Sequence, residues 1–345
     1  MYKFQKLAIG LLGLVFSQHS LIAAPYSGPL IDAHNQFGCD ISPKEIIEVL
    51  QSSSVTHTLL SVRQPCDKSD RTSLRELIDV RNAMPNKVSI LIPTKLGGNR
   101  GMSPRGVKLV RDLIDRHSEK SVGFAEIILQ HPDHDNKNHK AAGTFVELKS
   151  EEARRLTAFV IQSKKPIVLH VELKDFPDSA DQTVKDLVDF AAEVYPQKVM
   201  LMHMGQMTSD SAAMLLGKSP NIHFMMSTAD PFNQASVQRR KESSDKGQIG
   251  WINLFEDQGV KYSSKSLGKH LSKIRWKRDW QSLIEANPDR FVFAIDLVFK
   301  DPWLNRHAAK VEFWRYALGL LPETVALKIA CQNAQKAWGL SVSCR

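Results

Sequence analysis

The sequence is poor in cysteine, and it lacks several motifs that would point to common enzyme classes. Its 345 residues include four cysteines and no C-x-x-C pair, which argues against a metal held by cysteines. It contains no H-E-x-x-H, no P-loop and no G-x-S-x-G. Helical zinc proteases, phosphate-binding P-loops and serine hydrolases with a nucleophile elbow are therefore excluded.

The composition is that of a globular protein. Hydrophobic residues make up 42% and charged residues 24%, with 18 glycines and 16 prolines. These values exclude a largely disordered chain, a collagen-like fibre and a polytopic membrane protein. The length suffices for one large barrel or two ordinary domains.

The N-terminal residues have the order of a secretory signal. Lys3 and Lys6 precede an apolar run at 7–16, and a polar stretch then leads to Ala23 and Ala24. The run is too short to cross a bilayer comfortably, so we expect residues 1–24 to be a cleaved signal peptide rather than an uncleaved anchor. Residues 25–345 are then expected to be one exported domain, periplasmic or secreted, without a transmembrane segment.

Export predicts that the cysteines form disulfides, because oxidising compartments favour them. Cys39 and Cys66 each follow a predicted strand, so neighbouring loops can bring them together. Cys331 and Cys344 are close in the sequence, and a bridge over such a short loop contributes roughly 3 kcal/mol in the chain-entropy model. The alternative is four free buried thiols.

The chain after the signal repeats a strand-then-helix pattern that predicts a (β/α)8 TIM barrel. Eight apolar, β-branched runs read as parallel strands: 29–34, 57–62, 88–93, 122–129, 166–173, 198–204, 221–227 and 290–297. Helix starts are indicated by Ser42-Pro43, Ser103-Pro104 and Ser150, and two further helices are expected at 305–318 and 323–338. Eight units in roughly 300 residues fit a barrel better than a doubly wound open sheet.

A long basic loop is predicted after the seventh strand, from 229 to 275. The segment 239–278 contains eleven Lys or Arg and four Asp or Glu, a net charge of +7. It could be a lid that attracts anionic substrates, a patch that contacts nucleic acid or an anionic envelope surface, or a solvated loop. Its interleaved aromatic residues favour a lid with a packed underside: Trp251, Phe255, Tyr262, Trp276 and Trp280.

Candidate catalytic residues lie where the predicted strands end, because side chains at the carboxyl ends of barrel strands converge on one pocket. These positions are Asp32, His34, Gln36, Glu126, His170, Glu172, His203 and Asp296. A single histidine of this kind is more often structural, but imidazoles and carboxylates at several strand ends together indicate a divalent-metal site.

Five segments resemble the amidohydrolase superfamily, and most closely its amidohydrolase-related branch of metal-dependent hydrolases and decarboxylases. They are 31–36 (IDAHNQ), 168–170 (VLH), 201–205 (LMHMG), 290–296 (RFVFAID) and 328–340 (KIACQNAQKAWGL). The segments occur in order across 30–340. Glu126 more closely resembles the fourth-strand carboxylate of TatD-like nucleases in the same superfamily.

The resemblance implies a role for each matching residue. His34 and His170 would be metal ligands, His203 a ligand or a group that orients the attacking water, and Asp296 a ligand and general base. Glu126 would be a further ligand. A divalent cation acidifies water, and a nearby carboxylate can accept the proton. Zinc is the expected metal, with manganese or iron as alternatives.

Gln36 departs from the family pattern, in which the first strand carries two histidines separated by one residue. A glutamine oxygen is a weaker ligand for zinc than imidazole, so the site could hold metal loosely, choose another ion or work without one. The expected function is hydrolysis of a C–O or C–N bond in a small anionic molecule such as an amide, lactone or ester. The alternative is a non-catalytic or metal-independent barrel that binds an anionic ligand.

Two further groups could serve the site. Arg63 and Lys95, near the ends of strands two and three, suit a substrate carboxylate, or are rim charges. His131, His134 and His139 lie in a polar segment after strand four, which is either an accessory metal site or a solvated loop. A small-molecule substrate, rather than nucleic acid, is the expected partner, and the oligomeric state is left open.

Overall fold

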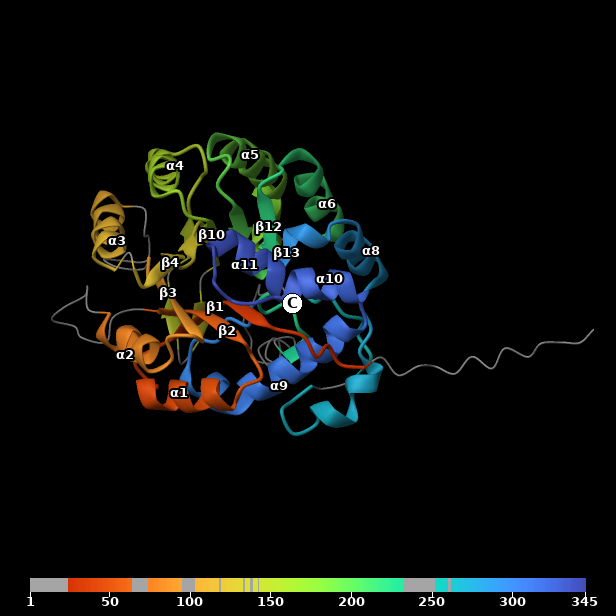
Figure 1. Cartoon of the computed structure of the whole chain (residues 1–345). Helices are drawn as coiled ribbons and strands as arrows, with labels where there is room; N and C mark the ends of the chain where they lie inside the picture. The colour runs from red at the N-terminus through yellow and green to blue at the C-terminus, as the bar shows by residue number, and fades with distance from the viewer. Residues whose placement is uncertain are drawn as a thin grey trace, which may run out of the picture.

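The computed structural model describes residues 24–63, 74–94, 103–117, 119–132, 134–136, 139–141, 143–232, 252–259 and 262–345. Helices form a ring around a central set of parallel strands (Figure 1). The α/β fold predicted from the sequence is confirmed, and each of the eight predicted strand segments contains a strand.

The eight barrel positions are occupied by nine strands, because the fourth is split in two. They are β1 (Ile31–Phe37), β2 (His57–Val62), β3 (Val88–Ile92), β4 (Ser121–Phe124) with β5 (Ile127–Ile128), β10 (Ile167–His170), β11 (Val199–Leu201), β12 (Ile222–Met225) and β13 (Phe291–Val292). Two short antiparallel pairs follow β5: β6 (Gln130–His131) with β9 (Thr144–Phe145), and β7 (His134–Asn136) with β8 (His139–Ala141).

The strands form two parallel sheets rather than one closed ladder, with the orders β1-β2-β3-β4 and β13-β12-β11-β10-β5. The split fourth strand links them on one side, since β4 pairs with β3 and β5 pairs with β10. On the other side, backbone hydrogen bonds connect β1 to the residues around β13. Ala33 donates to the carbonyl of Phe293 at 3.1 Å, and Asp296 donates to that of His34 at 3.1 Å.

The helices predicted to start after Ser42, Ser103 and Ser150 begin as expected, whereas the one predicted at 305–318 begins earlier, at Lys300. Most helices of the described part of the chain lie around the outside of the strands. The helices are α1 (Pro43–Ser52), α2 (Arg75–Ala83), α3 (Pro104–Arg116), α4 (Glu151–Ser163), α5 (Ala180–Glu193), α6 (Ser209–Lys218), α8 (Arg278–Ala286), α9 (Lys300–Gly319), α10 (Glu323–Leu327) and α11 (Asn333–Trp338). Ser42, Ser103 and Ser150 each accept a backbone hydrogen bond as the N-cap of α1, α3 and α4. These caps satisfy amide groups that the first helical turn leaves unpaired.

Alternating strand residues divide the core into two parts. One face of each strand packs against the helices, and the other fills the barrel interior. The interior cluster contains Ile31, Ala33, Leu59, Leu91, Ala125, Val168, Met200, Met202, Met225, Val292 and Ala294. The barrel is therefore a packed core, and polar chemistry is confined to its ends.

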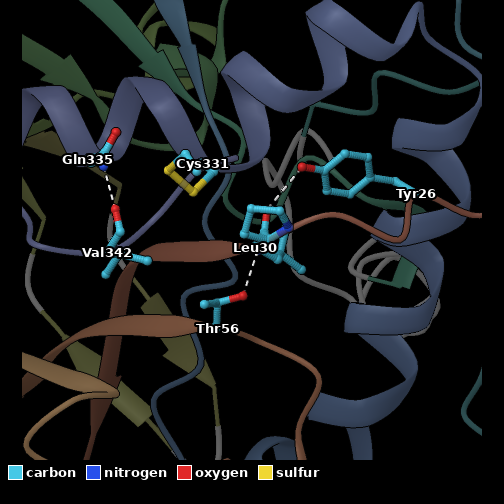
Figure 2. The surroundings of a disulfide bond; sticks show 8 residues. Tyr26, Leu30, Thr56, Cys331, Gln335 and Val342 are labelled. Atoms are coloured by element: carbon cyan, nitrogen blue, oxygen red, sulfur yellow. Dashed lines mark hydrogen bonds between the residues drawn. A yellow bond between two sulfur atoms is a disulfide. The ribbon is translucent and has the colours of Figure 1, made fainter.

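The C-terminal segment closes the end of the barrel where the strands begin. In Figure 1 the C-terminus lies at the centre of the helical ring, and Trp338, Leu340 and Cys344 belong to the interior cluster. The disulfide between Cys331 and Cys344 ties the tail to η7 (Lys328–Gln332), a π-helical turn, beside the start of β1 (Figure 2). Gly123 leaves room for the Trp338 indole, which a Cβ atom would approach to 3.4 Å.

The other predicted disulfide is described on one side only. Cys39 is disulfide-bonded. Its expected partner, Cys66, lies outside the described residues.

The predicted loop after the seventh strand lies partly outside the described residues, at 233–251 and 260–261. Trp251 is among these residues. The prediction that 229–275 forms a single basic loop therefore stays a prediction. The described aromatic residues are buried, with Phe255 at 2% and Trp276 at 4% exposure. The Phe255 ring lies 4.9 Å from that of Phe313 on α9. The expected packing of aromatic side chains beneath this segment is therefore present.

None of the helices in the described part of the chain combines the length and apolar character that a bilayer-spanning helix needs. The predicted signal peptide, 1–24, lies almost wholly outside the described residues.

Candidate active site

Six side chains singled out from the sequence lie together where the barrel strands end. They come from β1 (His34 and Gln36), the break between β4 and β5 (Glu126), the last residue of β10 (His170), the turn after β11 (His203) and the residues after β13 (Asp296). All but Asp296 are at most 5% exposed, and the Asp296 side chain is 8% exposed. Residues as far apart as 34 and 296 thus share one buried cluster of polar groups.

Gln36 connects two carboxylates of this cluster. Its Nε2 donates to Oε1 of Glu126 at 2.9 Å and to Oδ1 of Asp296 at 3.1 Å. The amide therefore presents its N–H groups, and not its carbonyl oxygen, to the two carboxylates. In this arrangement Gln36 supplies the positive partial charge that two buried carboxylates require.

Asp296 is the acid best placed to act as a base. Nδ1 of His34 donates to its Oδ1 at 3.2 Å. Burial alone would raise the pKa of Asp296, but the hydrogen bond and charge of His34 hold it below its usual range. The residue is therefore a carboxylate at neutral pH. With Oδ1 engaged by His34 and Gln36, Oδ2 is the oxygen turned toward His203.

His203 is held by the turn that follows β12. Its Nδ1 lies 3.2 Å from the carbonyl oxygen of Ser227 and 2.8 Å from Oγ1 of Thr228. Because a carbonyl can only accept, Nδ1 carries the proton. Burial and the nearby charge of His170 lower the pKa of His203 to about 4, so the ring is neutral. Its Nε2 therefore directs a lone pair toward Oδ2 of Asp296, 3.6 Å away.

The backbone at three strand exits adopts the left-handed conformation. His203, Thr228 and Asp296 have φ values of 52°, 55° and 55°. Few non-glycine residues adopt this conformation, and they concentrate at functional sites. It also explains why the sixth strand ends at Leu201 and not, as predicted, at 204: a strand cannot continue through left-handed residues.

His170 is hydrogen-bonded by a carboxylate on each side. Its Nδ1 lies 2.7 Å from Oε2 of Glu126, and its Nε2 lies 2.6 Å from Oε1 of Glu172. Burial opposes a charged imidazole, but the two carboxylates raise the pKa of His170 to about 10. Burial would raise the pKa of Glu172, yet the hydrogen bond from His170 lowers it to about 2.

The donor atoms present fit a divalent metal. Glu126, His170 and His203 each place one ligand atom within 4.8 Å of the others. The facing lone pairs of His203 Nε2 and Asp296 Oδ2 are both acceptors, so they need a proton or a cation between them. Nε2 of His34 is buried without a hydrogen-bond partner in the described part of the chain. Imidazole nitrogens and carboxylate oxygens of this kind suit zinc and its neighbours.

The other predicted residues are placed less completely. Arg63 follows β2, with its guanidinium 5.4 Å from the ring centroid of Phe299, three residues beyond Asp296. Lys95 and the side chains of His134 and His139 lie outside the described residues. His131 lies beside His170, with ring centroids 5.2 Å apart. The roles assigned to all these residues stay predictions.

Several supporting residues received no individual role from the sequence, although Asp32 and Glu172 were among the candidates at strand ends. Glu172 lies two positions after His170, so strand alternation places both side chains on one face of the strand. This spacing was the sequence signal that could have identified Glu172 as a partner of His170. Ser227 and Thr228 are polar residues at the end of the seventh predicted strand. Asp32 accepts a hydrogen bond from the backbone of Ile295 at 2.9 Å, and burial raises its pKa to about 7.

No protein-family model matches this chain, and no curated protein matches it. Several solved structures do. An amidohydrolase from Burkholderia multivorans with bound zinc is 14% identical, with a TM-score of 0.51 over 90% of this chain and 99% of that one. A dihydroorotase from Campylobacter jejuni is 13% identical, with a TM-score of 0.51 over 92% of this chain and 84% of that one.

A third similar structure is the N-isopropylammelide isopropylaminohydrolase from Burkholderia multivorans. It is 10% identical, with a TM-score of 0.50 over 91% of this chain and 75% of the other. An amidohydrolase is thus among the similar structures, in agreement with the sequence resemblance. At these identities the likeness establishes the fold and leaves the activity to be argued from the site.

Proposed function

We propose that this protein is an exported, divalent-metal-dependent hydrolase of a C–O or C–N bond in a small anionic molecule. The observation that carries the proposal is the geometry between His203 and Asp296, whose lone pairs face each other 3.6 Å apart beside Glu126 and His170. The fold supports it, because TIM-barrel enzymes place their chemistry at the carboxyl ends of the strands.

Glu126, His170 and His203 would hold the metal, with His34 and Asp296 completing the ligand set. The ion supplies Lewis acidity, which polarises the substrate carbonyl and acidifies a water molecule. We take zinc as the metal, because two or more imidazoles with a carboxylate are common in catalytic zinc sites.

The residues of the chain then divide the remaining work. Asp296 accepts the proton of the attacking water on Oδ2, because Oδ1 is already engaged by His34 and Gln36. His203, fixed by Ser227 and Thr228, keeps the lone pair of Nε2 directed toward the metal. The guanidinium of Arg63, at the exit of β2, would bind a carboxylate of the substrate.

Export is part of the proposal. The disulfide between Cys331 and Cys344 supports it, because cytosolic thiols are usually kept reduced. A periplasmic or secreted protein would also meet its substrate outside the cytoplasm. Detection of the mature chain, beginning near residue 25, in a periplasmic or culture fraction tests this point.

The decisive experiment combines metal analysis with hydrolysis. Protein purified without chelator is expected to contain stoichiometric metal and to hydrolyse a member of a panel of anionic lactones, esters and amides. Asp296→Asn should reduce hydrolysis at least 1,000-fold, roughly 4 kcal/mol of transition-state stabilisation. Asp289→Asn, in the short 3-10 turn η6 (Pro288–Arg290) that precedes β13, is the matched control and should keep full activity.

One observation favours a second candidate, a metal-independent or non-catalytic barrel that binds an anionic ligand. Gln36 already satisfies Glu126 and Asp296 without a cation. This alternative predicts protein without stoichiometric metal, and unchanged ligand binding in His170→Ala and Asp296→Asn. Stoichiometric metal that is lost in His170→Ala would reject it.

A further inference from the structure

A second cluster of metal-binding side chains lies on the outer side of His170. It consists of His131 at the end of β6, His170 itself, and Glu172 two residues later. Each residue places one ligand atom within 4.8 Å of the others. Glu172 is 2% exposed and His170 is 5% exposed, whereas the more accessible His131 is half-buried. The cluster therefore lies between the candidate active site and the protein surface.

The three side chains are oriented by their neighbours. Nδ1 of His131 donates to the carbonyl of Pro132 at 2.7 Å, so its proton is on Nδ1 and its coordinating atom is Nε2. Glu172 is hydrogen-bonded by the Asp175 side chain. Metal-binding histidines commonly donate their other N–H to a backbone carbonyl, and metal-binding carboxylates are commonly supported by a further hydrogen bond.

The donor types restrict the ion. Two imidazole nitrogens and one carboxylate oxygen form the three-ligand set of many zinc sites, and they also suit cobalt, nickel and copper. Magnesium and calcium prefer oxygen ligands only. The sequence suggested an accessory metal site at the histidines after strand four. The structure places one of them, His131, beside two further candidate ligands, His170 and Glu172.

We propose that His131, His170 and Glu172 form a second divalent-cation site, selective for zinc-like metals, that competes with the central site for His170. In the central site His170 would coordinate through Nδ1, the nitrogen next to Glu126. In the outer site it coordinates through Nε2, the nitrogen next to Glu172. A neutral imidazole carries a proton on one nitrogen and a lone pair on the other, so it serves one of the two ions at a time.

The competition has a functional consequence, and this part rests on the proposed function. An ion at the outer site withdraws His170 from the central ion and weakens its binding. Metal in excess of one equivalent is therefore expected to inhibit the enzyme, while one equivalent activates it. The outer site itself does not depend on catalysis.

Cobalt titration of metal-free protein, followed by its visible absorption and by equilibrium dialysis, tests both sites separately. His203→Asn removes a ligand of the central site only, and His131→Asn removes a ligand of the outer site only. His131→Gln is a second outer variant, and His117→Asn, remote from both clusters, is the matched control. Circular dichroism confirms that each variant is folded.

We expect the His203→Asn variant to bind one cobalt ion, and the His131→Asn/His203→Asn double variant to bind it at least 30-fold more weakly. The His131→Asn and His131→Gln variants should bind one ion centrally and lose inhibition by excess metal. Equal binding by His203→Asn and the double variant would overturn the outer site. If His131→Asn binds no cobalt while His203→Asn still binds one ion, the outer site is supported and the central site is rejected. If His203→Asn binds no cobalt while His131→Asn still binds one ion, the outer site is rejected and the proposed function is unaffected.

Discussion

Gln36 donates a 2.9 Å hydrogen bond to Glu126, although their strands are not neighbours in the sheet. The bond spans the barrel from β1 to the break between β4 and β5. The same amide nitrogen also reaches Asp296, so one side chain joins three strand ends. Gln36 is the position at which this chain departs from the two-histidine pattern of the family that it resembles. The structure shows that Gln36 acts as a hydrogen-bond donor to both carboxylates.

Replacing Gln36 by leucine should destabilise the metal-free protein. Glu126 and Asp296 would each lose a buried donor, and we expect unfolding to become easier by roughly 3 kcal/mol. A divalent cation between the carboxylates would replace that donor, so zinc should stabilise the variant more than it stabilises wild type. Urea unfolding with and without zinc measures both effects. Gln51→Leu, at an exposed position on α1, is the control; equal loss in both variants would contradict the bridging role of Gln36.

A histidine at the same position should have the opposite effect on metal binding. Gln36→His restores an imidazole beside His34 and Asp296, and a nitrogen ligand binds zinc more strongly than an amide does. We expect zinc affinity to rise at least tenfold, about 1.4 kcal/mol of binding free energy. Competition with a chromophoric chelator measures the change. Unchanged affinity would show that Gln36 does not face the metal.

The fold could be predicted largely from the sequence, because its signals are local. Eight apolar runs with helix caps between them are repeated patterns, and Ser42, Ser103 and Ser150 cap helices as expected. The barrel rule predicts His34 and Asp296 at strand ends. In the structure β1 continues to Phe37, so His34 lies within the strand rather than at its end. Local patterns, however, do not contain the hydrogen bonds that arise between strands.

The direction of the Gln36 amide is one such case, because it depends on Glu126 and Asp296 both lying within hydrogen-bond distance of its nitrogen. The contacts of Ser227 and Thr228 with His203 are another case, since they require left-handed backbone at His203 and at Thr228. The outer cluster was also missed: a polar segment containing His131 does not reveal that it packs against His170. Sequence spacing therefore does not predict side-chain contacts that form only when distant strands come together in the barrel.

A buried ion pair holds the turn that positions His203. Nζ of Lys310 on α9 donates to Oδ2 of Asp230 at 2.9 Å, with side-chain exposures of 2% and 0%. Asp230 lies two residues after Thr228, so the pair anchors this turn to α9. Lys310→Met should cost 3–5 kcal/mol, roughly, because it leaves a buried carboxylate uncompensated.

The double variant Lys310→Met/Asp230→Leu should recover most of that loss, since no buried charge remains. Lys300→Met breaks the exposed pair with Glu45 instead, and about 1 kcal/mol or less is expected. Chemical denaturation of wild type, Lys310→Met, Asp230→Leu and the double variant measures the cycle, with Lys300→Met as the control. A single variant as stable as the Lys300→Met control would show that the buried pair contributes little.

The disulfide at the C-terminus should stabilise the protein without affecting the active site. Cys331 and Cys344 are separated by 13 residues, and closing such a loop contributes roughly 3 kcal/mol. Cys331→Ser/Cys344→Ser should lower the free energy of unfolding by about that amount. Because the bridge lies at the opposite end of the barrel from His170, metal content should be unchanged. A loss of metal in this variant would contradict the separation of the two ends.

His223 should make the protein sensitive to acid. Its Nδ1 donates to the carbonyl of Asn221, and Nζ of Lys198 lies 3.3 Å from its Nε2. Burial and the neighbouring charge of Lys198 lower the pKa of His223 from 6.5 to about 3. Below pH 6.5 this histidine is protonated in the unfolded chain but stays neutral in the folded protein. The free energy of unfolding therefore falls as the pH drops from 6.5 toward 3.

Between pH 7 and pH 4.5 this histidine should account for a loss on the order of 3 kcal/mol, from about two pH units at 1.36 kcal/mol each. His223→Gln removes the titrating group, so the variant should lose that much less stability over the same range. Lys198→Met should recover part of it, because one opposing charge is gone. Urea unfolding at a series of pH values measures the slopes. Parallel curves for wild type and His223→Gln would show that His223 takes up its proton in the folded state as readily as in the unfolded chain.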